Sequence, residues 1–138
     1  MNKPFEMEKG ALKMPTIDPG VRIGHVHLKV ADLQRALDFY CGVLGFELTT
    51  SRPGAAFISA GGYHHHLGLN TWAGVGAPPP PPDVAGLRHF TVVLPNLAAL
   101  EQVAERVRHA GIALEQTDGG LLVRDPSHNG VVLASRPG

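Results

Sequence analysis

The sequence contains a single cysteine, Cys41, no excess of charge of either sign and no long apolar run. One cysteine excludes an internal disulfide. The 12 basic and 12 acidic side chains of the 138 residues cancel without a one-sided cluster, which argues against nucleic acid or an anionic membrane as a partner. Residues 1–20 lack the apolar segment of a signal peptide. We therefore expect a cytoplasmic protein that binds small molecules or further copies of itself.

The chain is short enough to build only one sizeable core, and 43% of its residues are hydrophobic, as in folded proteins. We expect residues 21–138 to form a single domain and residues 1–20 to form a flexible N-terminal arm. No glycine-rich segment stands between a predicted strand and a predicted helix, so a nucleotide cofactor is not indicated.

An internal repeat is the main organising feature. The segment GHVHLKVADLQRALDFY at 24–40 aligns without a gap with RHFTVVLPNLAALEQVA at 88–104, which places His25 over His89. Each segment begins with alternating apolar residues, typical of a half-buried strand, and continues with apolar residues at helical spacing. Each half therefore begins with a strand followed by a helix.

Capping residues mark both ends of the two predicted helices. Asp32 and Asn96 stand at matching positions before them, and such side chains accept hydrogen bonds from the first free backbone amides of a helix. Gly45 and Gly111 follow them, where glycine commonly ends a helix.

Three short strand candidates follow each predicted helix, separated by turn sequences rich in glycine, proline and aspartate. They cover 46–50, 55–59 and 64–70 in the first half, and 112–116, 120–124 and 130–135 in the second. Both halves therefore read β-α-β-β-β. We predict an α+β fold of two tandem modules, 21–72 and 87–136, that form one open barrel enclosing a cavity.

A proline-rich segment at 73–86 separates the modules, with five consecutive prolines from Pro78 to Pro82. Such a run favours the polyproline II conformation and acts as a stiff spacer. We interpret it as a linker between the modules. The alternative is a docking peptide for a proline-binding domain.

The tandem pattern resembles the vicinal oxygen chelate superfamily, which includes glyoxalase I, extradiol dioxygenases and bleomycin-resistance proteins. The stretches IGHVHLKVADLQRALDFYCGVLGFEL, GGYHHHLGLNTW and RDPSHNGVVL are most similar to those of short bacterial catechol 2,3-dioxygenase-like proteins. The resemblance covers residues 22–136. It implies a ligand-binding cavity, with or without a metal, because the superfamily includes both metalloenzymes and metal-free binding proteins.

The resemblance implies that His25 and His89 occupy the two histidine positions of a metal site with two histidines and one carboxylate. The last strand of the superfamily usually reads Asp-Pro-(Asp)-Gly-Asn-Gly-(Ile/Val)-Glu. This chain reads DPSHNGVVL there, with Val132 in place of the glutamate ligand. We place the equivalent position of the first module at Leu67. Neither residue can bind a metal, so the metal triad is predicted to be incomplete.

The run of three histidines offers a replacement ligand. In a regular strand His64 and His66 share one face, while His65 points away with Leu67 and Leu69. His66 would miss the metal unless a bulge after the preceding two glycines shifts it. A three-histidine site would suit zinc.

Two functions of different classes remain. In the first, the protein binds a small aromatic or oxygen-rich ligand in its cavity. In the second, His25 and His89 hold a divalent metal such as iron, manganese or zinc for dioxygenase or lyase chemistry. The predicted ligand-binding residues are His27, Tyr63, His64, His66 and Trp72. The resemblance also implies a homodimer.

Overall fold

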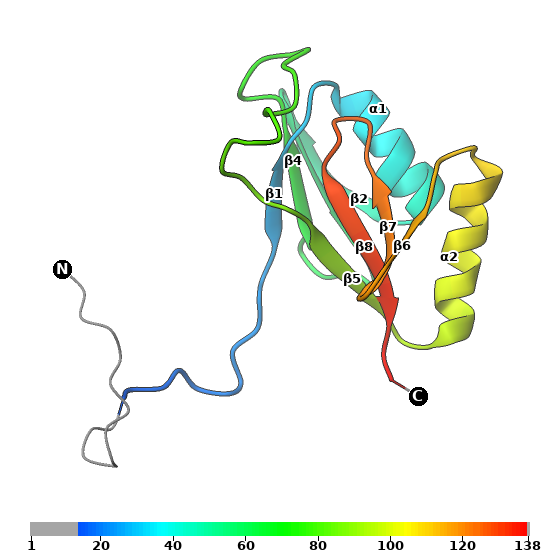
Figure 1. The fold of residues 1–138 in the computed structure, drawn as a ribbon. Helices are drawn as coiled ribbons and strands as arrows, with labels where there is room; N and C mark the ends of the chain where they lie inside the picture. Colours follow the sequence, from blue (N-terminus) through cyan, green and yellow to red (C-terminus); the bar gives the residue numbers. More distant parts are fainter. Residues whose placement is uncertain (1–13, 138) are drawn as a thin grey trace.

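The computed structural model describes residues 14–137 (Figure 1). Most of the arm predicted at 1–20 lies outside the described residues. Residues 14–20 contain no helix or strand and are largely exposed, and they extend away from the sheets.

Each module forms one four-stranded sheet. The first has the order β1–β4–β3–β2 and the second the order β5–β8–β7–β6. The strands of the first sheet are β1 (Val26–Lys29), β2 (Glu47–Arg52), β3 (Ala55–Ser59) and β4 (Leu67–Asn70). Those of the second are β5 (Phe90–Leu94), β6 (Glu115–Thr117), β7 (Gly120–Arg124) and β8 (Gly130–Ser135). In each sheet the first and last strands pair in parallel and the other pairs are antiparallel.

This topology confirms the predicted α+β class and the tandem β-α-β-β-β order. The two mixed sheets do not close into a barrel within residues 14–137. In each module the helix is the crossover between the first strand and the rest of the sheet, as a parallel strand pair requires. The repeat in the sequence therefore appears as a repeat in topology.

The first helical segment begins as predicted but changes its winding. Its α-helical part is α1 (Leu33–Leu37), and the Asp32 side chain accepts a hydrogen bond from the Arg35 amide. The chain continues as a π-helix, η1 (Asp38–Leu44), which the sequence spacing did not predict. The amides of Gly45 and Phe46 both donate to the Tyr40 carbonyl, so the last turn is wider than an α-helical one. Gly45 ends the segment with a φ of 100°.

The second helix, α2 (Leu97–His109), is α-helical throughout. The Asn96 side chain accepts from the Ala99 amide, and Gly111 follows the helix with a φ of 77°. Both helices lie on the same side of the molecule and are close together in Figure 1. One apolar cluster, which includes Leu28, Tyr40, Val107 and Leu133, spans both modules and packs the two sheets against the helices.

A buried hydrogen bond joins the modules. The Tyr40 hydroxyl donates to Asp125 Oδ2 over 2.8 Å. The other Asp125 oxygen accepts from the backbone amides of Ser127 and Asn129 over 2.8 and 2.9 Å. Asp125 is 3% exposed, so these donors replace the water that a buried carboxylate would otherwise need.

The turn between β7 and β8 also contacts the first module directly. The Ser127 hydroxyl accepts from the Ala31 amide over 2.8 Å, and the Asn129 side-chain amide donates to the Lys29 carbonyl over 3.0 Å. The segment at 73–86 has no helix or strand, but it is held at two points. The Gly76 amide donates to the Ala31 carbonyl, and the Lys29 ammonium donates to the Pro78 carbonyl.

Candidate functional site

The two faces of the first sheet differ in chemistry. Side chains alternate along β1, so Leu28 is buried against the helices while His27 faces the other way and is exposed. His27 lies beside Trp72, with ring centroids 5.1 Å apart, and beside Phe57, at 6.0 Å. The ring centroid of His25 lies 6.4 Å from that of His27. We call this surface the histidine face and define it by His25, His27, Phe57 and Trp72.

A glycine beneath His27 makes room for its ring. Gly68 pairs with His27 across the β1–β4 ladder. A Cβ atom at Gly68 would lie 2.9 Å from Cε1 and Nδ1 of His27. Trp72, whose ring lies beside that of His27, is 68% exposed. The imidazole thus lies over a bare backbone and beside an indole that faces solvent, and His27 and Trp72 form the centre of the histidine face.

The histidine run is not part of a strand. Residues 64–66 form a bend and β4 begins only at Leu67, so the strand predicted at 64–70 is three residues shorter than expected. Gly61 and Gly62 precede the bend with φ values of 72° and 83°. Such values favour glycine and take the chain out of regular strand geometry. The alternation assumed for the three histidines therefore does not apply.

The bend changes the predicted orientation of His65. His65, expected to point away with the core residues, lies 4.3 Å from His25 and 5.0 Å from Phe57 between ring centroids. It therefore belongs to the histidine face. It was not among the predicted ligand-binding residues. The sharing of one cavity by His64 and His66 stays a prediction, and the rings of both pack against Tyr63, with centroids 4.3 and 4.5 Å away.

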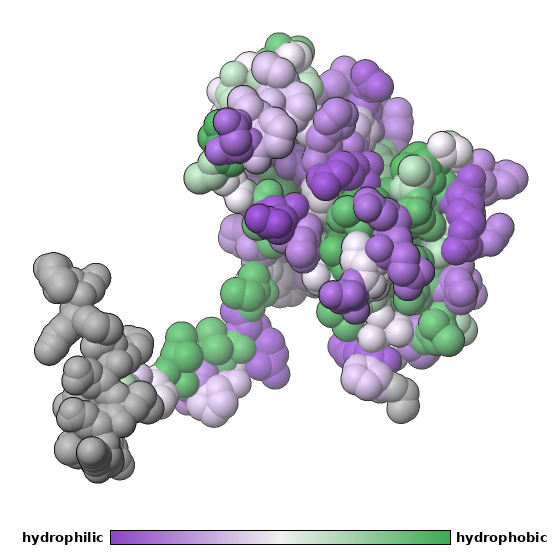
Figure 2. Space-filling model, viewed as in Figure 1, coloured by the Kyte–Doolittle hydropathy of each residue, from purple (hydrophilic) through white to green (hydrophobic). Residues whose placement is uncertain are grey.

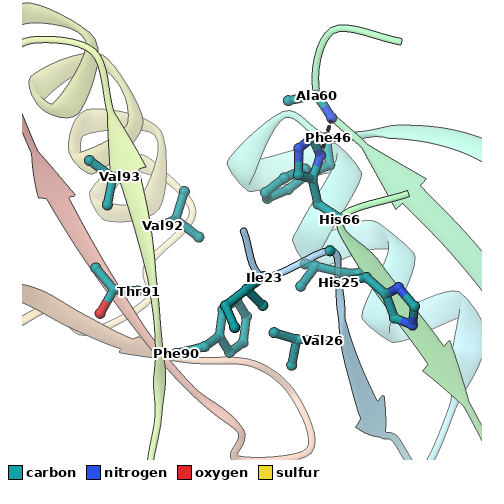
Figure 3. Close-up of a pocket in the computed structure, with 12 residues that line it drawn as sticks. Ile23, His25, Val26, Phe46, Ala60, His66, Phe90, Thr91, Val92 and Val93 are labelled. Atoms are coloured by element: carbon teal, nitrogen blue, oxygen red, sulfur yellow. Dashed lines mark hydrogen bonds between the residues drawn. The ribbon is translucent and has the colours of Figure 1, made fainter. Parts of the chain in front are cut away.

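His66 lines a cavity between the two modules (Figure 3). The cavity has a volume of about 300 Å³, and Phe46, Phe90 and Val92 contribute much of its apolar wall. Nδ1 of His66 accepts a hydrogen bond from the Ala60 amide over 3.2 Å. That nitrogen is already used, so His66 presents mainly its remaining ring atoms to the cavity. His25 stands at the border between the cavity and the histidine face.

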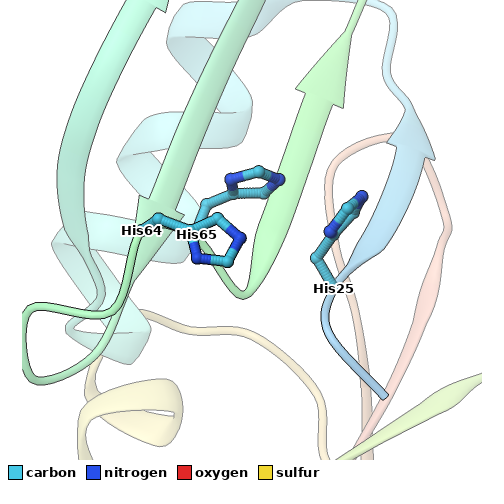
Figure 4. A group of neighbouring side chains, drawn as sticks. All are labelled: His25, His64 and His65. Atoms are coloured by element: carbon cyan, nitrogen blue, oxygen red, sulfur yellow. The ribbon is translucent and has the colours of Figure 1, made fainter. Parts of the chain in front are cut away.

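Three histidines gather potential metal-ligating atoms. One ring nitrogen from each of His25, His64 and His65 can be chosen such that all three lie within 4.8 Å of one another. Figure 4 shows His64 and His65 facing His25 across the space between β1 and the bend. Partial burial, followed by the charges of the neighbouring histidines, lowers the pKa of His65. Its neutral form, the form that binds metals, is favoured.

His89 is not part of this group. It stands exposed immediately before β5, as His25 stands immediately before β1, so the symmetry predicted from the repeat is present in the fold. Its role as a partner of His25 in a metal site stays a prediction. The remaining predicted residue, Tyr63, packs its ring against His64 and His66 at 4.3 and 4.5 Å, at the edge of the bend.

The carboxylate of the superfamily's metal site has no counterpart in either module. Val132 pairs with Thr91, and His27, which matches Thr91 in the repeat, pairs with Gly68. The first-module equivalent of Val132 is therefore Gly68, and the assignment to Leu67 is wrong by one residue. Leu67 packs into the core instead. Valine and glycine offer no ligand atom, so these residues do not fit a set of two histidines and one carboxylate.

Comparison with known proteins places the chain in a family. The model of the Glyoxalase/Bleomycin resistance protein/Dioxygenase superfamily matches residues 22–133. The chain belongs to this superfamily. It is 48% identical over 121 residues to a catechol-2,3-dioxygenase of Bacillus subtilis. The alignment covers 86% of this chain and 42% of that protein, so the chain spans about two fifths of that relative's length.

Solved structures show the same fold. A lactoylglutathione lyase from Agrobacterium tumefaciens superposes with a TM-score of 0.65 at 24% identity, covering 86% of this chain and 96% of that one. An antibiotic binding protein from Streptomyces sp. CB03234 superposes with a TM-score of 0.60 at 20% identity, covering 86% and 98%. Across residues 14–137, no helix has the length and apolar character needed to span a membrane.

Proposed function

We propose that the protein binds a flat, oxygen-bearing aromatic molecule on its histidine face, and that this binding needs no metal ion. The observation that carries the proposal is the exposed pair of His27 and Trp72, seated over Gly68. Two ring systems 5.1 Å apart, open to solvent on one side, provide a surface on which an aromatic ring can stack.

The neighbouring groups supply polarity around that surface. His25 and His65 stand at one end, and Phe57 lies between His27 and His65, with ring centroids 6.0 and 5.0 Å away. A neutral imidazole carries one donor and one acceptor nitrogen, so it can bind a hydroxyl group in either direction. An apolar platform with a few polar groups at its edge is the usual composition of a small-molecule site.

The family supports this class of ligand. Superfamily members bind small molecules. The Bacillus subtilis relative is named for catechol, a flat ring with two adjacent hydroxyls. Solved structures with the same fold include both a lyase and an antibiotic binding protein, so the scaffold serves catalysis and simple binding alike. The missing carboxylate at Val132 and Gly68 favours binding for this chain.

The test uses the fluorescence of Trp72, which is the only tryptophan of the chain. Protein kept in excess EDTA is titrated with catechol, with cyclohexane-1,2-diol as a non-aromatic control ligand. We expect saturable quenching by catechol only. The variants His27→Leu and Phe57→Leu should weaken binding by roughly tenfold, because each removes part of the platform or its polar edge. The matched control is His109→Gln at the end of α2.

Quenching that rises linearly without saturation, or that is unchanged in both platform variants, would exclude this binding site. Calorimetry on the variant Trp72→Phe provides a second measurement that does not depend on fluorescence. There we expect catechol binding to weaken but persist, because phenylalanine keeps a smaller aromatic surface.

A second candidate function is catechol ring cleavage with His25 and His89 as metal ligands, and the 48% identity to the dioxygenase favours it. Oxygen consumption by the ferrous-loaded chain in the presence of catechol decides between the two. We expect no uptake above the protein-free rate from the wild-type chain. Uptake that disappears in His89→Gln would establish the enzyme instead.

The homodimer and the cytoplasmic location remain part of this proposal. The relative is more than twice as long as the stretch that this chain matches, so two copies of this chain would approximate its mass. Sedimentation equilibrium should give the mass of two chains, and a monomer at every accessible concentration would refute the dimer.

A further inference from the structure

We propose that His25, His64 and His65 bind one divalent transition-metal ion of the zinc class. The inference is separate from the proposed function, because it concerns the metal alone and makes no use of a bound organic ligand. It also differs from the superfamily's arrangement of two histidines and a carboxylate, since all three donors are nitrogens and two of them come from one bend.

The donor set is suited to such an ion. Its three ring nitrogens lie within 4.8 Å of one another, and no carboxylate is a member of the group. Imidazole nitrogens favour zinc, copper and nickel over magnesium or calcium, which require oxygen ligands. His25 and His64 are exposed and His65 is partly buried, so one side of the group faces solvent. A water or a further ligand can take the fourth tetrahedral position there.

The backbone beneath the donors is held in place. The His66 amide donates to the Ile58 carbonyl over 2.8 Å, and the Val26 amide donates to the His66 carbonyl over 3.0 Å. The Thr49 hydroxyl lies 3.0 Å from the His64 carbonyl and 2.9 Å from that of Phe57. The bend is therefore attached to β1, β2 and β3. These bonds fix the distances from the Cα atoms of the bend to the Cα atom of His25.

Only side-chain rotation is needed to complete the site. Bonds of about 2.0–2.1 Å to a tetrahedral ion place ligand nitrogens about 3.3 Å apart. The two most distant nitrogens, which now lie within 4.8 Å of each other, must therefore approach by somewhat more than 1 Å. Rotation about χ1 and χ2 moves an imidazole nitrogen by this amount between allowed rotamers. The exposed His25 and His64 can rotate without displacing core atoms.

The experiment measures affinity for Zn²⁺ alone on the full chain, with any purification tag removed. Competition against a chromophoric chelator gives the dissociation constant and the stoichiometry. We expect one Zn²⁺ per chain, with a loss of roughly 100-fold or more in each of His25→Gln, His64→Gln and His65→Gln, because each removes one of three coordination bonds. Co²⁺ should show the intense visible bands of tetrahedral coordination in the wild type and lose them in each variant.

Two controls discriminate the site from its neighbours. His66→Gln changes the next residue of the same run, which is outside the group, and should keep its Zn²⁺ affinity within about twofold. His89→Gln tests the pair implied by the superfamily and should also leave the affinity unchanged.

The proposal is overturned if the wild type binds no Zn²⁺ in this assay. It is also overturned if His89→Gln weakens binding while His64→Gln and His65→Gln do not. Urea unfolding of each variant shows whether a loss of affinity comes from a loss of fold. Catechol binding in EDTA tests the proposed function independently, so either result can fail while the other stands.

Discussion

The hydroxyl of Tyr40 donates to Oδ2 of Asp125 over 2.8 Å, at a point where the two side chains are 0% and 3% exposed. The two residues are 85 positions apart and belong to different modules. This bond lies within the helix-side core, away from the histidine face. It therefore contributes to the docking of one module on the other and takes no part in the candidate site.

Removing the Tyr40 hydroxyl should destabilise the fold without affecting ligand binding on the histidine face. We expect Tyr40→Phe to lower the free energy of unfolding by about 2 kcal/mol, because a hydrogen bond to a buried charged group is lost while the Asp125 carboxylate stays buried. Urea unfolding measures the change. Tyr63→Phe, the same change at the other tyrosine, which is 37% exposed, is the matched control and should alter stability by less than about 0.5 kcal/mol. Equal losses of stability in both variants would show that the buried bond from Tyr40 to Asp125 contributes nothing special to the fold.

Tyr40 should also make the stability of the protein sensitive to high pH. Burial first, and then the charge and hydrogen bond of Asp125, raise the pKa of Tyr40 far above its ordinary value of 10.0. The neutral phenol is thus favoured in the folded state. Its contribution to stability is complete below about pH 10 and falls at higher pH, where only the unfolded chain ionises, by up to about 1.4 kcal/mol per pH unit.

Urea unfolding of the wild type and of Tyr40→Phe between pH 8 and pH 11 isolates this effect, because all other titrating groups are common to both. The stability difference between the two proteins should be constant up to about pH 10 and then shrink. A difference that stays constant to the highest pH would show that Tyr40 titrates alike in the folded and unfolded chains.

Replacing His128 by glycine should stabilise the protein. His128 has a φ of 69°, in the left-handed region, and no other described non-glycine residue has a positive φ. Its Cβ atom makes that conformation costly, and glycine removes the cost. We expect His128→Gly to raise the free energy of unfolding by about 1 kcal/mol, after the greater flexibility of glycine in the unfolded chain is subtracted. His128→Ala keeps the Cβ atom and should bring no gain.

A methyl group at Gly68 should disturb the site while sparing the fold. The new Cβ atom would lie 2.9 Å from the His27 ring, and the ring, at the end of a side chain, can turn away. We expect Gly68→Ala to change stability by less than about 1 kcal/mol, to shift the emission of Trp72 and to weaken catechol binding by roughly tenfold. Gly42→Ala, where no atom lies within 4 Å, is the control and should leave both signals unchanged.

Much of the fold could be predicted because it follows from local patterns. Alternating apolar residues predicted a half-buried first strand, in which Leu28 is buried, and both helix-capping side chains, Asp32 and Asn96, accept the hydrogen bonds expected of them. The helical spacing of buried residues such as Ala36 and Tyr40 was also correct. These features depend on neighbours within a few positions along the chain.

The site could be predicted only in part because it depends on contacts between distant segments. The position of His65 beside His25 requires the chain to leave strand geometry after Gly61 and Gly62. The two glycines signalled a break in the strand, but not the direction in which the next side chains would turn. Likewise, the equivalence of Gly68 and Val132 follows from the register of β1 with β4 and of β5 with β8, which no local pattern contains.

In the bend at 64–66, only His66 continues the backbone hydrogen bonds to the neighbouring strands, while His64 and His65 lie outside the strands. Substitutions of His64 and His65 alter no strand pairing, while His25 stands fixed at the start of β1. Histidine and aspartate codons differ by a single nucleotide. One base change in the bend would therefore bring an anionic oxygen beside two imidazoles, the donor combination that both modules lack. The proposed three-histidine site therefore stands one mutational step from a donor set of two histidines and one carboxylate.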